Sequence, residues 1–245
     1  MKFLTQHEFS RTELLIGKNN LETLRNKKVA VIGIGGVGSF VVEALTRSSI
    51  GKLILVDNDT ISLTNMNRQL HATHKTLSKN KVDVMAERVK DINLECEVQT
   101  FNTFITEKNI PEIIQEVHYV VDAIDTVSSK IDLILYCKKN NINIISCLGT
   151  GNKLDPTMFK ISDIYKTKIC PLAKVMRYEL RKRNVESLKV LYSEEIPIKP
   201  KQDEMAHYKE NIAKRQIPGS ISFVPPVAGM IIAGEVIKEL INLGS

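Results

Sequence analysis

The stretch VAVIGIGGVGS (residues 29–39) decides the fold. Four apolar residues lead into a cluster of glycines, and Ser39 begins a segment typical of a helix. Gly33, Gly35 and Gly38 fit the pattern G-x-G-x-x-G between a strand and a helix. In this setting the first glycine permits a tight turn, the second lets a phosphate approach the backbone, and the third lets the helix pack on the strand. The stretch therefore predicts a nucleotide site at a helix N-terminus.

Patterns of strands and helices alternate along the rest of the chain. Apolar runs and amphipathic stretches predict a helix to about residue 48, then strand 53–56, helix 81–92, strands 97–101 and 119–121, helix 130–139 and strand 142–146. Short helices are expected within residues 10–26. The closing segment, from Ser220 onward, predicts a short strand, a proline turn and a helix. We expect an α/β, Rossmann-like fold with a doubly wound, mainly parallel sheet and a C-terminal strand–helix extension.

No break in composition marks a second domain, so residues 1–245 are expected to form one domain. Its predicted parts are a helical arm at 1–28, a nucleotide-binding core at 29–155, and a substrate-facing and C-terminal packing region at 156–245. Residues 156–200 are mixed and basic, and residues 201–219 are polar and rich in turn formers.

Composition narrows the class of protein only in part. No apolar run reaches the ~18 residues that a membrane helix needs, and the first residues lack the apolar run of a signal peptide, so we expect a soluble cytoplasmic protein. The formal charge of +6 fits either a lysine-rich solvated surface or an anionic partner such as RNA. The four cysteines form no C-x-x-C pair, which argues against a disulfide framework and a structural zinc site.

Polar residues that suit a triphosphate follow the second predicted strand. Asp57 lies about 20 residues after the glycine turn, where a carboxylate binds ribose hydroxyls. Further polar residues come later in the chain, namely Asp59, Asn65, Asn67, Arg68, Gln69, Lys81, Asp122 and Asp125. Parallel sheets bind ligands at the carboxyl ends of their strands, so these side chains are expected to converge on the glycine turn. Cationic groups for a triphosphate and a carboxylate for Mg²⁺ indicate nucleotidyl transfer from ATP rather than hydride transfer.

Each of these residues also has an ordinary structural explanation. Taken by itself, Arg68 could be a surface arginine and Lys81 a solvated lysine at the start of a helix. Asp125 could cap the helix that follows it. Their order around one glycine turn favours a shared site over three separate coincidences.

The combination GIGGVGS, D-x-D, T-N-x-N-R-Q, a lysine and D-A-x-D resembles the ubiquitin-activating-enzyme superfamily, whose members adenylate a carboxylate with ATP and Mg²⁺. Within this superfamily the chain resembles the tRNA threonylcarbamoyladenosine dehydratases. The segments that carry this resemblance are FSRTELLIG (9–17), NRQLHA (67–72), MAERVKDIN (85–93), DAIDT (122–126), GTGNKLDPT (149–157), CPLAKVMR (170–177) and FVPPVAG (223–229). The resemblance implies ATP-dependent cyclisation of threonylcarbamoyladenosine beside the tRNA anticodon, by adenylation of its carboxylate.

The resemblance also implies roles for individual residues. ATP would be bound by Gly33, Gly35, Gly36, Val37, Gly38, Asp57, Asp59, Asn67, Arg68, Gln69, Lys81 and Asp125. Arg68, Lys81, Asp125 and Arg11 would be catalytic, with Asp125 holding Mg²⁺. Arg11 resembles an arginine that superfamily dimers donate to the ATP site of the other subunit, which implies a homodimer. A protein for sulfur relay or delivery is a further partner to be considered.

The expected activated carboxylate belongs to tRNA, because the paired C-x-x-C motifs common in carrier-protein activators are missing. A basic segment offers phosphate contacts from Lys166, Lys168, Lys174, Arg177 and Arg181, and Lys209, Lys214 and Arg215 are weaker candidates. Cys170 is the best-placed cysteine for a covalent role, whereas Cys147 is expected to be a buried small hydrophobe. Adenylation of a ubiquitin-like or sulfur-carrier protein, and nucleotide binding without catalysis, remain alternatives.

Overall fold

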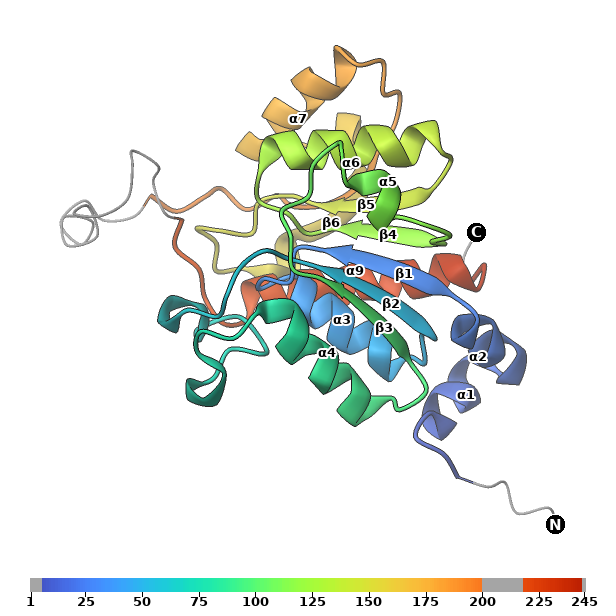
Figure 1. Ribbon diagram of the computed structural model, residues 1–245. Helices are drawn as coiled ribbons and strands as arrows, with labels where there is room; N and C mark the ends of the chain where they lie inside the picture. The colour runs from blue at the N-terminus through green and yellow to red at the C-terminus, as the bar shows by residue number, and fades with distance from the viewer. Residues whose placement is uncertain (1–5, 200–217, 244–245) are drawn as a thin grey trace.

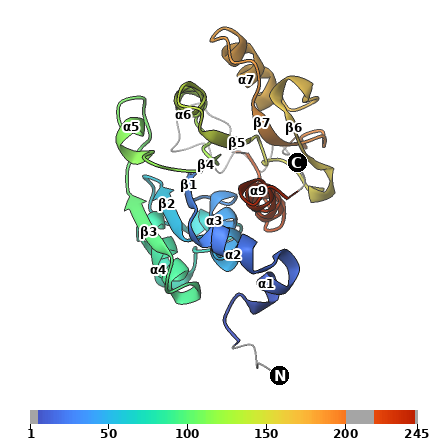
Figure 2. The same cartoon turned by 90° about the vertical axis from the view of Figure 1, so that its right-hand side faces the viewer.

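The computed structural model describes residues 6–199 and 218–243, and these form a seven-stranded sheet between two layers of helices (Figures 1 and 2). The sheet order is β3-β2-β1-β4-β5-β7-β6. All strand pairs are parallel except β6 and β7, which are antiparallel. The strands are β1 (Lys28–Ile32), β2 (Lys52–Val56), β3 (Glu97–Phe101), β4 (Tyr119–Asp122), β5 (Asn143–Cys147), β6 (Phe159–Asp163) and β7 (Lys189–Ser193). The predicted fold class is confirmed.

Helices cover both faces of the sheet. α3, α4 and α9 pack on one face and α5, α6 and α7 on the other, while α1 and α2 lie beyond one end of the strands (Figure 1). The helices are α1 (Ser10–Ile16), α2 (Lys18–Arg25), α3 (Gly38–Arg47), α4 (Lys81–Ile92), α5 (Ile110–Ile113), α6 (Val127–Lys139), α7 (Pro171–Arg181) and α9 (Val224–Leu240). Short 3₁₀ turns are η1 (Leu63–Asn65), η2 (His74–Thr76), η3 (Pro156–Met158) and η4 (Ile164–Lys166). No helix among the described residues is long and apolar enough to cross a bilayer.

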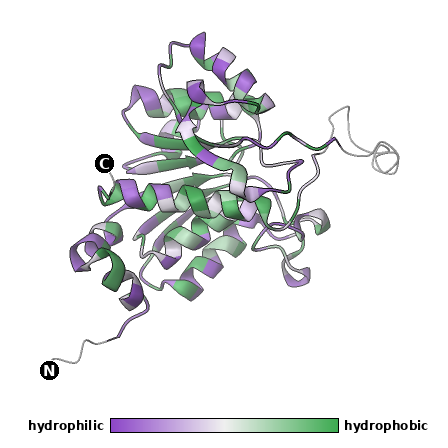
Figure 3. Ribbon diagram, turned by 180° about the vertical axis from the view of Figure 1, so that it is seen from behind, coloured by the Kyte–Doolittle hydropathy of each residue, from purple (hydrophilic) through white to green (hydrophobic). Residues whose placement is uncertain are grey.

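The apolar run of β1 is buried on both faces of the sheet. Val29 and Val31 pack with the core beneath α3, α4 and α9, whereas Ala30 and Ile32 point to the core beneath α5, α6 and α7. This alternation follows from the two-residue period of a strand, and it explains why a central parallel strand is continuously apolar. α9 crosses the first of these faces, and hydrophobic residues run along most of its length (Figure 3).

The sheet changes direction between β1 and β4. The chain moves outward from β1 through β2 to β3 and then returns to β4, which pairs with the other edge of β1. The connections after β1 and β4 therefore diverge to opposite faces and leave a crevice at the carboxyl ends of these strands. Ligands of open α/β sheets bind at such a switch point.

Two predictions about the C-terminal third need correction. No strand precedes the last helix in residues 218–223, and Pro225 and Pro226 lie in the first turn of α9 instead of in a separate turn. Proline is tolerated there because the N–H groups of a first helical turn have no partner within the helix. The basic segment 156–200 contains β6 and β7, which form an antiparallel pair. Polar residues interrupt the apolar pattern of both strands, so the sequence did not predict them.

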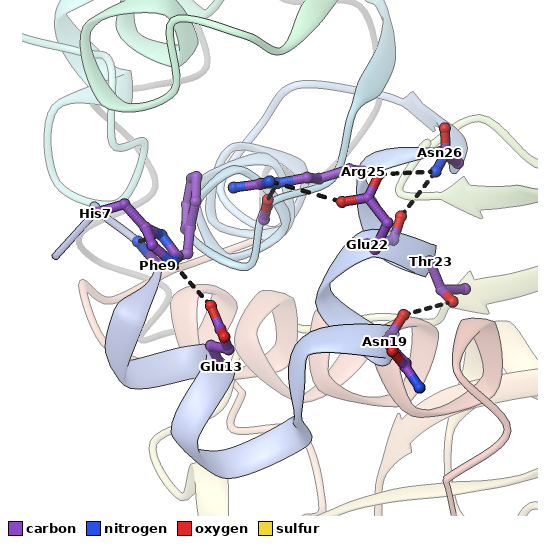
Figure 4. A network of polar contacts seen from close by, with 9 residues as sticks. His7, Phe9, Glu13, Asn19, Glu22, Thr23, Arg25 and Asn26 are labelled. Carbon is purple, nitrogen blue, oxygen red and sulfur yellow. Dashed lines mark hydrogen bonds and ion pairs between the residues drawn. The ribbon is translucent and has the colours of Figure 1, made fainter. Parts of the chain in front are cut away.

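The N-terminal arm is held by hydrogen bonds within it and by a contact with the main body (Figure 4). Phe9 is buried, and the His7 ring bonds to the Glu13 carboxylate at 2.8 Å. Arg25 of α2 donates to the Ser49 hydroxyl at 3.3 Å, in the turn that follows α3. The arm thus packs at the amino ends of the strands, opposite the crevice.

Candidate active site

A cavity of about 540 Å³ opens at the switch point, at the carboxyl ends of β1, β2, β4 and β5. Most of the predicted nucleotide-binding residues line it, namely Gly33, Gly35, Gly36, Val37, Asp57, Asp59, Arg68, Gln69, Lys81 and Asp125. Gly38 and Asn67 are not among the residues that line it. Its volume falls in the range typical of small-molecule sites. The structure thus gathers into one cavity residues that lie up to 92 positions apart in the sequence.

The glycine turn is sterically fixed at both ends. Gly33 has φ of +91°, a conformation that L side chains rarely adopt, and a Cβ there would lie 2.7 Å from the carbonyl oxygen of Ala123. A Cβ on Gly38 would overlap the carbonyl oxygen of Gly33. These contacts bring the start of α3 close to β1 and β4. Gly35, Gly36 and Val37, which immediately precede the helix, line the cavity, so an anion there would lie at the N-terminus of α3, which favours negative charge.

Asp57 joins the glycine turn to the end of β2. Its carboxylate accepts hydrogen bonds from the backbone N–H of Ile34 at 2.6 Å and of Asp59 at 2.9 Å. Burial raises the pKa of the Asp57 carboxyl above its ordinary value, against the opposing effect of the Lys81 ammonium. The carboxylate is thereby held in place beside the turn.

Lys81 and Arg68 supply positive charge to the cavity. Lys81 is only 4% exposed, and its ammonium lies 2.6 Å from Asp59 and 3.9 Å from Asp57. Arg68 is half-buried and donates to the Thr64 carbonyl and the Asn67 side-chain oxygen, both at 2.9 Å. Lys81 is therefore neutralised by carboxylates in the described structure, and a phosphate group would compete with them for the ammonium.

Buried polar atoms of two side chains that follow Arg68 lack hydrogen-bond partners among the described residues. They are the Gln69 side-chain oxygen, which belongs to a residue lining the cavity, and both ring nitrogens of His71. Burial, reinforced by the Lys81 charge, lowers the pKa of His71 to about 4. Buried polar atoms are rarely left without a partner, so these atoms indicate that this part of the chain has a role besides packing.

Lys130, which no sequence pattern singled out, fixes the loop that carries Asp125. Lys130 and Asp122 are both fully buried and form an ion pair of 2.9 Å. The Lys130 ammonium also donates to the carbonyls of Ile124 at 3.0 Å and Cys147 at 2.9 Å. All three of its protons are used, so one side chain connects the carboxyl ends of β4 and β5. Asp125 itself is exposed at the edge of the cavity, where it accepts from the Thr126 hydroxyl at 3.3 Å.

Several segments that sequence reasoning did not assign complete the lining. They are residues 103–105 after β3, residues 147–151 after β5, Leu172 of α7, residues 218–220 and Pro225. The GTGN sequence that follows β5 was a signal for one of them, since small residues at a strand end typically allow close approach of a ligand.

Comparison with known proteins agrees with this geometry. The model of the ThiF family matches residues 9–245. The chain belongs to the ThiF family. Within that family, it is 47% identical over 242 residues to the tRNA threonylcarbamoyladenosine dehydratase of Bacillus subtilis, covering 96% of this chain and 95% of the relative. It is also 47% identical over 178 residues to the Haemophilus influenzae protein of the same name, covering 72% and 68%. The chain thus belongs to the dehydratase group of ThiF proteins.

Solved structures of a further family member place nucleotides in this fold. The Escherichia coli tRNA N6-threonylcarbamoyladenosine dehydratase, in complexes with ATP and with AMP, matches this ThiF chain with a TM-score of 0.86 and 32% identity, covering 96% of this chain and 94% of the other. The shared fold supports the interpretation of the crevice as a nucleotide site.

The predicted residues outside the crevice are distributed over two other regions of this ThiF protein. Arg11 is exposed on α1, at the opposite end of the sheet from the cavity (Figure 1). Lys166, Lys168, Lys174 and Arg181 are exposed on or just before α7, as predicted for a surface contact. Arg177 is instead half-buried and donates to the carbonyl and hydroxyl of Thr167, so part of its hydrogen-bonding capacity is used internally. Lys209, Lys214 and Arg215 lie outside the described residues.

The cysteines are buried, and none of the four is disulfide-bonded. Cys147 lines the cavity, but burial raises the pKa of its thiol to about 12, which confirms its expected character as a small hydrophobe. Cys170 is 3% exposed, and its burial speaks against the covalent role considered for it. No cluster of three or more His, Cys, Asp or Glu side chains within residues 6–199 and 218–243 could hold a metal ion.

Proposed function

We propose that this ThiF protein catalyses the ATP-dependent dehydration of threonylcarbamoyladenosine next to the tRNA anticodon. One observation carries the proposal: Asp57, Arg68 and Lys81 meet the glycine turn in one cavity, in a chain that matches a dehydratase over nearly its whole length. Residues 1–245 act as a single adenylation domain in the cytoplasm, where tRNA is found.

ATP is the co-substrate of this reaction. The glycine turn and the N-terminus of α3 accept the phosphates, Asp57 binds the ribose, and Arg68 and Lys81 neutralise the triphosphate, with Gln69 and Asn67 beside them. Lys81 exchanges Asp59 for a phosphate oxygen as ATP enters. Lys81 is 4% exposed next to two carboxylates, so it is not the solvated lysine that an ordinary helix start would carry.

The donor set fits Mg²⁺ that arrives with the nucleotide. Asp125 offers one exposed carboxylate at the cavity edge, and the described residues contain no cluster that could bind a metal alone. Mg²⁺ in phosphate sites is bound by one or two carboxylates together with phosphate oxygens and water. When bound, Mg²⁺ would neutralise charge on the phosphates, and Asp125 would orient it.

The chemistry proceeds in two steps. An oxygen of the threonyl carboxylate attacks the α-phosphorus of ATP, the bond to the β-phosphate oxygen breaks, and pyrophosphate leaves, while Arg68 and Lys81 stabilise the charge that develops. A nucleophile within the modification then attacks the activated carbonyl and expels AMP, so the net change in the nucleoside is the loss of water. Closure within one bound molecule gains from high effective concentration, and no protein nucleophile is needed.

The tRNA contacts the basic surface of α7 and the turn before it. Leu172, in the first turn of α7, lines the cavity, so the exposed side chains of Lys174 and Arg181 continue outward from the site itself. Phosphate contacts of this kind position a nucleic acid without reading its sequence.

A homodimer explains the position of the N-terminal arm. α1 buries none of its residues, and Leu14 and Leu15 are 84% and 86% exposed. Arg11 lies on this helix and cannot line the cavity of its own chain, so a second copy is the recipient of its side chain. Light scattering tests this: replacing Leu14 and Leu15 by Asp is expected to convert a dimer into monomers, and a wild-type monomer would contradict the idea.

The test of the function is mass spectrometry of nucleosides from threonylcarbamoyl-modified tRNA, incubated with the protein and Mg²⁺, with and without ATP. We expect an ATP-dependent loss of one water mass that Arg68→Ala abolishes. No mass change with competent tRNA and ATP-binding protein would refute the proposal. A ubiquitin-like or sulfur-carrier protein ending in Gly-Gly would then be tested as the adenylated substrate, with a delivery partner for it.

A further inference from the structure

Residues 218–220, which we call the wall segment, line one side of the cavity without belonging to a helix or strand. Since no regular ladder holds this backbone, its position depends on hydrogen bonds to other parts of the chain. Two asparagines supply them, Asn152 from the loop after β5 and Asn67 from the loop before Arg68.

Asn152 makes two hydrogen bonds to Gly219 of the wall segment, one to its carbonyl and one to its N–H. Its backbone N–H donates to the Gly219 carbonyl at 2.8 Å, and its side-chain oxygen accepts from the Gly219 N–H at 2.7 Å. Its own carbonyl accepts from Ile198 N–H at 2.8 Å. Asn152 adopts a left-handed φ of +58°, a conformation that asparagine tolerates better than most residues. One residue thus connects three segments that are distant in the sequence.

The packing beside Asn152 leaves little freedom for the wall segment. A Cβ on Gly151 would lie 2.8 Å from the Cβ of Pro218, so the glycine permits the loop and the wall segment to touch. At the other end, the Asn67 side chain donates to the Ser220 carbonyl at 2.9 Å and accepts from Arg68. The wall segment is therefore fixed relative to the side chain that we assign to the triphosphate.

The position of Asn152 in the sheet indicates what this wall faces. The strands that bound the cavity follow one another in the order β2, β1, β4 and β5. Asp57, assigned to the ribose, follows β2, and the glycine turn, assigned to the phosphates, follows β1. The loop with Asn152 follows β5. Along the edge of the sheet, this loop and the ribose site after β2 therefore lie on opposite sides of the phosphate site after β1. The wall segment thus bounds the part of the cavity left for the carboxylate that attacks ATP.

We propose that Asn152 is a positioning residue that fixes the wall segment as the boundary of the acceptor side of the active site. Its contribution is made through Gly219 rather than by contact with the reacting atoms. The inference rests on the proposed function for the identity of the acceptor, but the positioning of Gly219 can be measured independently.

Three substitutions separate the hydrogen bond from the backbone conformation. Asn152→Ala removes the acceptor and strains the left-handed φ; Asn152→Gly removes the acceptor but relieves the strain; and Asn152→Asp retains an acceptor at a tolerated φ. The matched control is Asn141→Ala, because Asn141 is exposed, has φ of +53° and lies before the amino end of β5, away from the cavity.

Amide hydrogen exchange at Gly219, followed by mass spectrometry, is the first readout. We expect exchange to accelerate about tenfold in Asn152→Ala and Asn152→Gly, consistent with the loss of one hydrogen bond, and to stay near the wild-type rate in Asn152→Asp and Asn141→Ala. Unchanged exchange in Asn152→Ala would overturn the proposal. Restoration by Asn152→Gly would also overturn it, because strain and not the hydrogen bond would then be responsible.

The second readout is kinetic. In Asn152→Ala we expect kcat/KM for modified tRNA to fall about tenfold while ATP affinity stays within about twofold of wild type. The substitution frees Gly219 on the acceptor side, whereas Ser220 keeps its separate hydrogen bond to Asn67 on the nucleotide side. Equal losses for ATP and tRNA would overturn the assignment to the acceptor side. A wild-type protein that leaves competent tRNA unchanged would refute the proposed function instead, whereas the exchange rates decide the role of Asn152 in either case.

Discussion

The buried pair of Asp122 and Lys130 is expected to be the most sensitive polar contact in this protein. Both side chains are fully buried, and the ammonium also donates to the carbonyls of Ile124 and Cys147. Lys130→Met keeps the length of the side chain but leaves a carboxylate in the core without its cation. Removing one partner of a buried pair typically costs about 3–5 kcal/mol. We therefore expect the free energy of unfolding to fall by about 4 kcal/mol, a large share of the roughly 5–15 kcal/mol of a typical domain.

Urea denaturation followed by circular dichroism measures this effect, and a double-mutant cycle isolates the pair. Asp122→Asn alone is also costly, because it leaves the ammonium buried without its anion. The double variant should lose less than the sum of the two single losses, by at least about 2 kcal/mol, since no unpaired charge remains. Lys139→Met is the control: Lys139 is exposed on the same helix and should change stability by less than about 0.5 kcal/mol. Additive single losses, or a Lys130→Met loss below about 1 kcal/mol, would contradict the reasoning.

Three further predictions concern the glycine turn and the surroundings of Lys81. Gly38→Ala should destabilise the protein by about 1–3 kcal/mol, because the new Cβ overlaps the Gly33 carbonyl. Gly234→Ala in α9 is the control: a Cβ there has nothing within 4 Å, so this substitution should be neutral or stabilising. Thermal melts of both variants test the difference. Lys81→Met should weaken ATP binding about tenfold or more and AMP binding less, as measured by calorimetry, and equal losses would speak against a contact with the terminal phosphates. The pKa of His71 in the folded state is about 4, below its ordinary value, so His71 binds fewer protons in the folded than in the unfolded state. The free energy of unfolding therefore falls as the pH is lowered from 6.5 to 4, by up to about 1.4 kcal/mol per pH unit. Urea midpoints of His71→Leu should show a shallower fall over that range, and parallel curves would exclude His71 as the cause.

The sequence was sufficient to predict the central strands and the crevice. Every residue in the runs 29–32, 53–56 and 119–121 is buried in one of the two hydrophobic cores. Parallel strands between two layers of helices are buried on both faces, so their sequences are continuously apolar. The converging polar residues could be predicted because most of them follow a strand or begin a helix. Asp57 follows β2, Asp125 follows β4 and Lys81 begins α4, while Arg68 and Gln69 lie in the connection between β2 and α4. Their common position is then a consequence of the parallel topology alone.

The residues that escaped prediction owe their roles to tertiary contacts. Lys130 lies in a helix where lysine is normally solvated, and only the approach of Asp122 and two carbonyls makes its burial favourable. Asn152 lies in a loop whose partner, Gly219, is 67 residues away. The β6–β7 pair joins segments about 30 residues apart, and its strands carry lysines and an aspartate that break the apolar pattern. No local period encodes any of these contacts.

The charges of the cavity explain why nucleotide and metal are expected to enter together. Its charged lining residues are Arg68, Lys81, Asp57, Asp59 and Asp125, which give a net charge of −1 when all are ionised. A triphosphate is strongly anionic, and Arg68 and Lys81 offset only part of its charge because three carboxylates share the cavity and two of them lie beside Lys81. Mg²⁺ held by Asp125 would change this balance, because it would bring two positive charges to the cavity. In the proposed reaction, Lys81 would then leave Asp59 and stabilise the charge that develops when pyrophosphate leaves.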